Sequence, residues 1–447
     1  MSSIKTLELR DETTSQSEEA FDWRNCWYPV SFLRDLPRER PTGFSIYDEP
    51  LVLFFDGDGV LTCMDDRCPH RSARLSDGQL IDGRLECLYH GWQFGAGGRC
   101  LRIPQAPEGF GIPEKACVRS YPLRIVKDMV WVWMGDPEQT ESRPIPVTEC
   151  IGDPDVTCVD FQMDLPYDQS YLIENVIDIA HIHIAHHGMR GGGHRDAALP
   201  MKFKILKNSV EGIRSGFRTI RPGMTGDEED PVLRGAYVDY VAPNLIRYDS
   251  EYRDESLKAG LDLYSLPLGK SRCRLLYRKY SNFTSRREAM KPRWLEHWTQ
   301  CLILEQDMGV VVGQHEQIEK SEGPLKDMWL PLATSDRLVI EYRKWLDRFG
   351  ANLPFYRGWT TAKASGDDPD IRKLSWDRYT LHTRICATCS RMHRNLGRAN
   401  QGVLAVAAVA AGLGIVTDGW VSILSVAGAL GLLGAATGIR RLRRRFE

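Results

Sequence analysis

Cys68-Pro-His70 and Cys87-Leu-Tyr-His90, separated by sixteen residues, decide the character of the first part of this 447-residue chain. Each motif supplies one cysteine and one histidine, so together they offer two thiolates and two imidazoles. Such a set can hold two irons, with the thiolates on one and the imidazoles on the other, or it can close a tetrahedral zinc site. Zinc fingers group their ligands by type, as C-x2-4-C and H-x3-5-H, whereas each motif here mixes the two types. The spacing therefore favours an iron–sulfur cluster over zinc.

This ligand set is that of a Rieske 2Fe-2S centre, and the sequence around it predicts a small β domain. Replacing two thiolates by imidazoles raises the reduction potential to roughly −150 to +300 mV, so the cluster would pass single electrons to stronger oxidants. Short apolar runs flank tight turns, among which Asp82-Gly83 is a strong hairpin signal. Three consecutive hairpins are predicted, pairing 51–55 with 60–64, 80–81 with 84–85, and 92–94 with 99–103.

A second metal-binding pattern follows in the middle of the chain. Asn175, Asp178, His181 and His186 form the pattern N-x2-D-x2-H-x4-H. Asp178 and His181 would share a helix face, but His186 lies about 140° further round than His181 at 3.6 residues per turn. Both imidazoles can reach one ion only where the helix is interrupted, so we expect a bulge or a helix that ends near residue 185. His183 is predicted to be a core histidine or a histidine that supports the iron ligands without binding the iron.

The two patterns, with Trp23-Arg-Asn-Cys-Trp27 and Asp128-Met-Val-Trp-Val-Trp133, resemble the Rieske non-haem iron oxygenases. The resemblance implies a mononuclear ferrous site beside the cluster, and an electron path that crosses between subunits. It implies cluster ligands Cys68, His70, Cys87 and His90, iron ligands His181 and His186, and catalytic residues Asn175 and Asp178, of which Asp178 bridges to a Rieske histidine of a neighbouring subunit.

A site with two histidines needs a carboxylate as third ligand, with open positions left for dioxygen. In the oxygenase family a later helix supplies an aspartate, and Asp307 within residues 302–314 carries that resemblance. Asp307 heads a helical stripe that continues through Val310, Val311 and Gln314. An acid in such a stripe is costly to bury unpaired, which favours Asp307 as the ligand. The alternative carboxylates are Glu305 and Asp336.

The C-terminal segment predicts a membrane anchor. Residues 399–417 and 419–439 are uncharged stretches of nineteen and twenty-one residues, separated by Asp418. At about 1.5 Å per residue, each can cross a hydrocarbon core of roughly 30 Å. Arginines flank both outer ends, within 391–398 and 440–445, so the positive-inside rule places both ends on the cytoplasmic side. Gly434-Ala-Ala-Thr-Gly438 is predicted to pack the two helices closely, and a buried or interfacial hairpin is the alternative.

Cys386-Ala-Thr-Cys389 stands just before these apolar stretches. A chain that combines a Rieske domain, an iron motif, a C-terminal C-x-x-C and a terminal hairpin resembles the pheophorbide a oxygenase group. That group includes chlorophyll-breakdown oxygenases of plants and bacterial and cyanobacterial relatives. Ala185-His-His-Gly188 and Asp377-Arg-Tyr379 carry the same resemblance. It implies that Cys386 and Cys389 are a thioredoxin-responsive redox pair, and structural or inert cysteines are the alternative.

Composition agrees with a redox enzyme of several domains. The net charge of −2 gives no reason to expect nucleic acid as a partner. Twelve cysteines are too sparse for a disulfide scaffold and favour a reducing compartment. Residues 1–20 resemble neither a secretory signal nor a transit peptide, so we expect a bacterial protein or a mature organellar form. No G-x-G-x-x-G links a strand to a helix, so the reducing power is expected from another protein.

The resemblance implies ferredoxin as electron donor, O2 as co-substrate and a homotrimer. A membrane anchor suits a large hydrophobic substrate, and we expect a chlorophyll-derived tetrapyrrole such as pheophorbide a. Arg190 and Arg195, in a glycine-rich stretch, could face its carboxylates or belong to a solvated loop. The alternatives are a monooxygenase of a sterol, lipid or aromatic acid, and a membrane redox-sensing or electron-relay subunit.

The predicted fold class is α+β, with an all-β Rieske domain, a helix-grip catalytic domain built on an antiparallel sheet, and a C-terminal transmembrane helical hairpin. We expect an integral membrane protein with its catalytic domains on the cytoplasmic side, at a thylakoid or plasma membrane if it is cyanobacterial. The predicted segments are a disordered acidic N-terminus 1–22, a Rieske domain 23–140, a catalytic iron domain 141–380, a C-x-x-C segment 381–398, two transmembrane helices 399–439 and a basic tail 440–447.

Overall fold

A computed structural model describes residues 20–189, 193–226, 228–285, 290–321, 323–363 and 377–447. The chain divides into two compact units. The first unit comprises Met1–Ala289 and Ile303–Leu374, and the second comprises Met290–Leu302 and Ser375–Glu447. Helix α4 (Arg293–Glu319) is continuous and contributes residues to both units.

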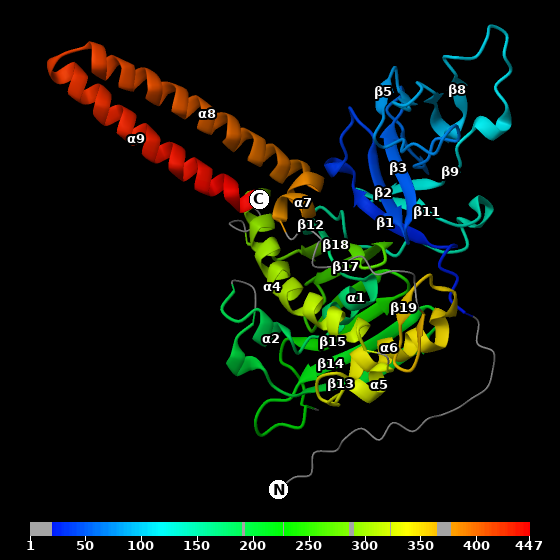
Figure 1. The fold of residues 1–447 in the computed structure, drawn as a ribbon. Helices are drawn as coiled ribbons and strands as arrows, with labels where there is room; N and C mark the ends of the chain where they lie inside the picture. The colour runs from blue at the N-terminus through cyan, green and yellow to red at the C-terminus, as the bar shows by residue number, and fades with distance from the viewer. Residues whose placement is uncertain (1–19, 190–192, 227, 286–289, 322, 364–376) are drawn as a thin grey trace. The chain divides into compact units, whose positions relative to one another are not determined.

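The N-terminal part of the first unit is built from short antiparallel strands (Figure 1). All three predicted hairpins are present, pairing β3 with β4, β5 with β6, and β7 with β8. Asp82 and Gly83 turn the second hairpin with φ of 48° and 72°, a left-handed conformation that this dipeptide tolerates well. The strands are β1 Trp27–Phe32, β2 Thr42–Ile46, β3 Glu49–Phe55, β4 Leu61–Asp65, β5 Gln79–Ile81, β6 Arg84–Glu86, β7 Gln93–Phe94, β8 Cys100–Arg102, β9 Ser120–Tyr121, β10 Leu123–Val126 and β11 Met129–Trp133.

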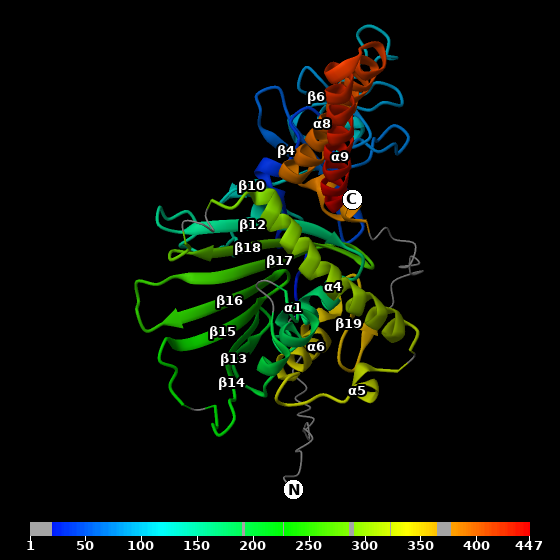
Figure 2. The same cartoon turned by 90° about the vertical axis from the view of Figure 1, so that its left-hand side faces the viewer.

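The rest of the first unit is a seven-stranded antiparallel sheet in the order β12-β18-β17-β16-β15-β14-β13. Helices α1 and α6 pack against this sheet, as Figure 2 shows, so the predicted α+β class is confirmed. The sheet consists of β12 Thr157–Leu165, β13 Met201–Ser209, β14 Gly212–Thr219, β15 Leu233–Val241, β16 Leu245–Tyr252, β17 Ala259–Gly269 and β18 Arg272–Ser281. The other elements of this unit are α1 Gln169–Ile177, α2 Ile182–Ala185, α5 Leu325–Met328, α6 Arg337–Phe349, β19 Tyr356–Arg357 and β20 Ala362–Lys363.

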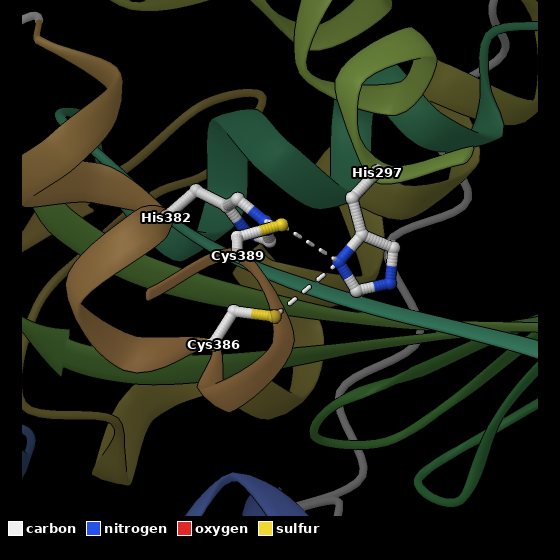
Figure 3. Close-up of side chains that lie close together, drawn as sticks. All are labelled: His297, His382, Cys386 and Cys389. Carbon is white, nitrogen blue, oxygen red and sulfur yellow. Dashed lines mark hydrogen bonds between the residues drawn. The ribbon is translucent and has the colours of Figure 1, made fainter. Parts of the chain in front are cut away.

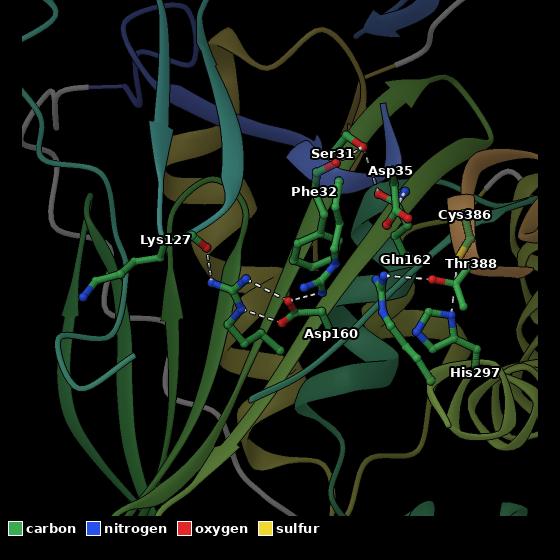
Figure 4. A network of polar contacts seen from close by, with 12 residues as sticks. Ser31, Phe32, Asp35, Lys127, Asp160, Gln162, His297, Cys386 and Thr388 are labelled. Carbon is green, nitrogen blue, oxygen red and sulfur yellow. Dashed lines mark hydrogen bonds and ion pairs between the residues drawn. The ribbon is translucent and has the colours of Figure 1, made fainter. Parts of the chain in front are cut away.

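A buried ion pair within the large sheet also contacts the β domain (Figure 4). Asp160 of β12 accepts hydrogen bonds of 2.6 and 2.9 Å from Arg278 of β18, and both residues are buried. Arg278 also donates to the carbonyl oxygen of Lys127, in the turn between β10 and β11, at 2.6 Å. Burial opposes ionisation of Asp160, but Arg278 and Arg34 together hold its pKa below the ordinary value. The pair therefore fixes the β10–β11 turn against the sheet.

The first described residues depart from the sequence prediction. Residues 1–22 were expected to be disordered, but Phe21 is fully buried and its N–H donates to the carbonyl oxygen of Phe349 at 2.9 Å. Its ring lies 5.7 Å from that of Trp345 in α6. An aromatic ring that covers α6 gains hydrophobic stabilisation, so the prediction is wrong for this residue. Residues 1–19 lie outside the described part of the chain.

The second unit contains an antiparallel helical hairpin, α8 (Ala387–Val416) and α9 (Gly419–Arg443), preceded by α7 (Arg378–Leu381) (Figure 1). Both long helices are long and apolar enough to cross a membrane, and only 6% and 11% of their apolar windows are buried. Their close contact is not at the predicted G-x-x-x-G, since a Cβ at Gly434 or Gly438 would meet nothing within 4 Å. A Cβ at Gly414 would instead lie 2.7 Å from Val426, because the helices approach near their connecting turn.

Candidate metal centres

The residues of the first sequence motif lie in two similar loops of the β domain. Cys68 and His70 lie between β4 and β5, whereas Cys87 and His90 lie between β6 and β7. In each loop the N–H four residues after the cysteine donates to the carbonyl oxygen of that cysteine, at 2.9 Å. The donors, at positions 72 and 91, both have a left-handed φ, of 58° and 72°. The two loops therefore present their side chains in matching ways although their sequences differ.

The loops bring the two thiols together and the two imidazoles together. Cys68 and Cys87 are 2% exposed, and their thiols interact. The rings of His70 and His90 are 4.5 Å apart, and Trp92 stacks on His70 at 4.8 Å. Burial raises the pKa of the Cys68 thiol to about 11, so a positively charged metal would have to stabilise its thiolate. Thiols on the inner side and imidazoles toward the surface fit a 2Fe-2S cluster with unlike ligands on its two irons.

A second donor set lies in the catalytic part of the first unit. The Nε2 atoms of His186 and His181 lie 3.2 and 3.6 Å from Oδ1 of Asp307. One ligand atom from each of the three side chains lies within 4.8 Å of the others, as a shared ion requires. His186 and Asp307 are buried, whereas His181 is partly exposed. Two imidazoles and one carboxylate leave coordination positions open and fit a non-haem ferrous ion.

The backbone around the two histidines explains how they converge. Helix α1 ends at Ile177, and Asp178 caps it with ψ of 94°, outside the helical range. A short helix α2 then covers Ile182–Ala185, with His181 before it and His186 after it. The predicted end near residue 185 is confirmed, but Asp178 and His181 do not lie on one continuous helix. The break at Asp178 lets both imidazoles face α4.

Hydrogen bonds to the far nitrogens orient both imidazoles. Nδ1 of His181 contacts the carbonyl oxygen of Asp178, whose carboxylate Oδ2 lies 3.8 Å from the same nitrogen. Nδ1 of His186 lies 3.1 Å from Oε1 of Gln306, so Nε2 is the atom left to face Asp307. The contact with Asp307 raises the pKa of His186, whereas burial raises the pKa of Asp178 despite the nearby His181. Sequence reasoning missed Gln306, although it adjoins Asp307.

Comparison with known proteins supports these centres. A Rieske [2Fe-2S] domain model matches residues 26–122, and a pheophorbide a oxygenase model matches residues 240–324, which include Asp307. The chain is 32% identical to Protein TIC 55, chloroplastic, of Arabidopsis thaliana, over 97% of this chain and 85% of the relative. It is 31% identical to pheophorbide a oxygenase, chloroplastic, of Oryza sativa subsp. japonica, over 98% of this chain and 86% of the relative. The chain belongs to the pheophorbide a oxygenase family.

Membership of this family makes the chain a Rieske-type non-haem iron oxygenase, with a 2Fe-2S cluster and a mononuclear iron as cofactors. The fold agrees with that of dicamba monooxygenase bound to dicamba, with a TM-score of 0.59 and 24% identity. That likeness covers 74% of this chain and 98% of the other.

Other residues that the sequence suggested do not join the three convergent ligands. Among the described residues, half-buried Asn175 in α1 makes no hydrogen bond to them, and His183 has a buried Nδ1 without a partner. Arg195 is exposed, and Arg190 lies outside the described residues. Asp336 accepts hydrogen bonds from the Leu332 N–H and the Ser335 hydroxyl, so its carboxylate is part of the turn before α6.

The predicted stripe on α4 is partly wrong. Val311 is buried, but Val310 is 64% exposed. The buried face of the helix passes instead through Asp307, Met308, Val311 and Val312, so it lies further round the helix than the predicted stripe. Gln314 lies at its edge and donates to Glu174 of α1 at 3.0 Å. Glu305 is half-buried and is not one of the three convergent ligands.

The C-x-x-C pair lies in the second unit. Cys386 and Cys389 are both free thiols and both 1% exposed. Two buried histidines that the sequence analysis did not single out, His297 and His382, contact them (Figure 3). Hydrogen bonds with Cys389 and His297 lower the pKa of Cys386, although burial opposes this. The signal for the histidines was weak, because His297 lies 89 residues before Cys386 in the sequence.

Proposed function

We propose that this chain is a membrane-anchored oxygenase that uses electrons from a ferredoxin to insert oxygen from O2 into a chlorophyll-derived tetrapyrrole such as pheophorbide a. The observation that carries the substrate is the 31% identity, over 98% of the chain, to a protein named pheophorbide a oxygenase. The convergence of His181, His186 and Asp307 supports the reaction class.

In this proposal Cys68, Cys87, His70 and His90 hold the cluster, and His181, His186 and Asp307 hold the iron. When bound, the cluster would supply single electrons and the iron would supply open positions for O2. Burial of both cysteines keeps water from the sulfur side, while the exposed His70 and half-buried His90 offer an edge to other proteins.

Asp178 would connect the two centres across subunits of a homotrimer. Its backbone carbonyl holds His181, and its carboxylate is 27% exposed. A carboxylate tied to an iron ligand on one side and accessible on the other can accept a hydrogen bond from a histidine of a second subunit. This placement supports Asp178 as the link, with Gln306 orienting the other iron histidine.

Anchoring is supported by the exposed apolar surface of the hairpin. Val409, Ile415, Val421 and Leu424 are each more than half exposed. Five arginines lie within residues 440–445, and three lie within residues 391–398, so both ends of the hairpin carry positive charge suited to the same side of a membrane. Two relatives with similar chains are named as chloroplastic proteins, which supports a chloroplast-type membrane.

The test is turnover of the full-length protein with ferredoxin, NADPH-dependent ferredoxin reductase and 18O-labelled dioxygen. Pheophorbide a, chlorophyllide, a sterol and an aromatic acid are offered separately. We expect labelled oxygen in the pheophorbide product, and labelled product only from the sterol or the aromatic acid would contradict the proposed substrate.

Metal content tests the reaction class separately. We expect about three irons per chain, two in the cluster and one mononuclear. His181→Ala should retain the cluster spectrum, lose about one iron and stop turnover. The matched control His194→Ala removes an exposed histidine that pairs with Asp196, and it should keep all three irons. Two irons in the wild-type protein would contradict an oxygenase and favour an electron-relay subunit.

A further inference from the structure

Four buried side chains converge in the second unit, and none of them is a ligand of the two centres described above (Figure 3). His297 comes from the beginning of α4, His382 follows α7, and Cys386 and Cys389 stand at the start of α8. All four are at most 1% exposed. Two thiols and two imidazoles thus meet where water cannot solvate them.

The distances among these side chains match the edges of a metal tetrahedron. Nδ1 of His297 lies 3.4 Å from Sγ of Cys386 and 3.6 Å from Sγ of Cys389. Nε2 of His382 lies 3.3 Å from Sγ of Cys389, and all four ligand atoms lie within 4.8 Å of one another. Metal bonds of about 2.3 Å to sulfur and 2.0–2.1 Å to nitrogen give tetrahedral edges of roughly 3.3–3.8 Å.

We propose that His297, His382, Cys386 and Cys389 bind one Zn2+ ion in a closed tetrahedral site. Four protein ligands leave no position open for substrate or water, which is the arrangement of structural rather than catalytic zinc. Tetrahedral coordination by two sulfur and two nitrogen atoms is also characteristic of zinc.

The surroundings show what this ion would hold in place. Cys386 and Cys389 belong to an apolar cluster with Leu396 of α8 and Phe446 near the C-terminus. Thr383 donates to the carbonyl oxygen of Phe446 at 2.8 Å, so the end of the chain closes over the segment that carries the ligands. The ion would therefore join the start of α4 to the base of the helical hairpin.

Zinc binding and a redox role of the C-x-x-C pair make opposite demands on the thiols. A site with both thiolates on zinc cannot hold a disulfide between them, because forming the disulfide removes two electrons from the pair and leaves no thiolate to bind the metal. The two cysteines are free thiols in this structure. The inference does not depend on the substrate of the oxygenase, since it concerns a separate set of side chains.

The experiment measures metal in the full-length, detergent-purified protein by elemental analysis. We expect about one zinc per chain in addition to the irons, released by a mercurial reagent and detected with a chromogenic chelator. Cells grown with cobalt should yield protein with the thiolate-to-cobalt and tetrahedral ligand-field bands of a mixed sulfur and nitrogen site. Absence of zinc and of these cobalt bands would overturn the proposal.

Variants identify the ligands without reference to oxygenase activity. Cys389→Ser and His297→Asn should each lose most of the zinc while the spectrum of the 2Fe-2S cluster stays unchanged. The controls Cys301→Ser and His393→Asn change a buried cysteine and a largely buried histidine of the same unit that are not among the four, and both should keep zinc. If the variants fail to fold, the wild-type stoichiometry and cobalt spectrum still decide. A Cys386–Cys389 disulfide in the purified protein, detected by mass spectrometry, would overturn the proposal.

Discussion

Gln306 offers a sharp test of the iron centre, because its only assigned task there is to orient one imidazole. Its Oε1 lies 3.1 Å from Nδ1 of His186, and Nε2 of the same ring lies 3.2 Å from Asp307. The amide oxygen accepts the Nδ1 proton and so selects the tautomer whose Nε2 is free to bind a metal. Gln306→Leu preserves the approximate volume and removes this acceptor.

We expect Gln306→Leu to weaken binding of Fe2+ to the mononuclear site by about 10–100-fold, which is the usual effect of losing a hydrogen bond to a ligand histidine. This corresponds to about 1.4–2.7 kcal/mol of binding free energy. Gln306→Glu keeps an acceptor at the same position and should retain most of the affinity. Gln317→Leu, an exposed position on the same helix, is the matched control.

The assay is anaerobic titration of the iron-depleted mononuclear site with Fe2+, while the absorbance of the 2Fe-2S cluster serves as an internal standard for intact protein. Equal affinities in Gln306→Leu and Gln317→Leu would show that the contact does not orient His186. Loss of the cluster spectrum in Gln306→Leu would indicate general misfolding and would also count against a local role.

Three further predictions concern residues whose contacts the structure defines. Asp178→Asn should leave the iron content unchanged and reduce turnover by about 10–100-fold, and normal turnover would refute its linking role. Asp160→Asn leaves Arg278 buried without its partner and should lower the free energy of unfolding by about 3–5 kcal/mol. The control Asp153→Asn breaks an exposed ion pair with Lys258 and should lower it by only about 0–1 kcal/mol. Denaturant titration measures both values. The pKa of Asp160 is lower in the folded than in the unfolded protein, so its contribution to the free energy of unfolding is present above about pH 3.9 and is lost as the pH falls through the folded pKa. The difference in the free energy of unfolding between wild type and Asp160→Asn should therefore shrink only in acid. In Gly414→Leu the new side chain would meet Val426 and should destabilise the hairpin by about 1–3 kcal/mol. In the control Gly434→Leu the new side chain has open space and should have little effect. Equal effects of the two variants on protease resistance would contradict the contact at Gly414.

The parts of the fold that the sequence predicted depend on local signals. Asp82-Gly83 adopts the left-handed turn that its residue types favour, and its flanking strands pair as expected. The end of the helix near residue 185 followed from a simple angle, since two imidazoles five residues apart cannot meet on a regular helix. These features need only a few neighbouring residues to define them.

The features that the sequence did not predict depend on residues far apart in the chain. Gln306 is 120 residues from His186, and only its position next to Asp307 distinguishes it from the other glutamines of α4. The G-x-x-x-G at Gly434 and Gly438 marks a smooth face of one helix, but the crossing of two helices decides which face is used. Here Ser422 donates to the carbonyl oxygen of Gly414 at 2.6 Å, and that contact lies at the opposite end of α9.

Helix α4 carries one ligand of the candidate iron centre and one ligand of the proposed zinc site. It carries His297 near its beginning and Asp307 ten residues later, without a break between Arg293 and Glu319. A helix fixed at His297 by a metal loses freedom to fray or rotate about its axis, and Asp307 must stay within a few tenths of an ångström of its place to serve as a ligand. Loss of zinc would then weaken the binding of Fe2+ to the mononuclear site, although no iron ligand has changed. By thermodynamic linkage, bound iron would strengthen zinc binding by the same factor, so the coupling should be measurable from either site.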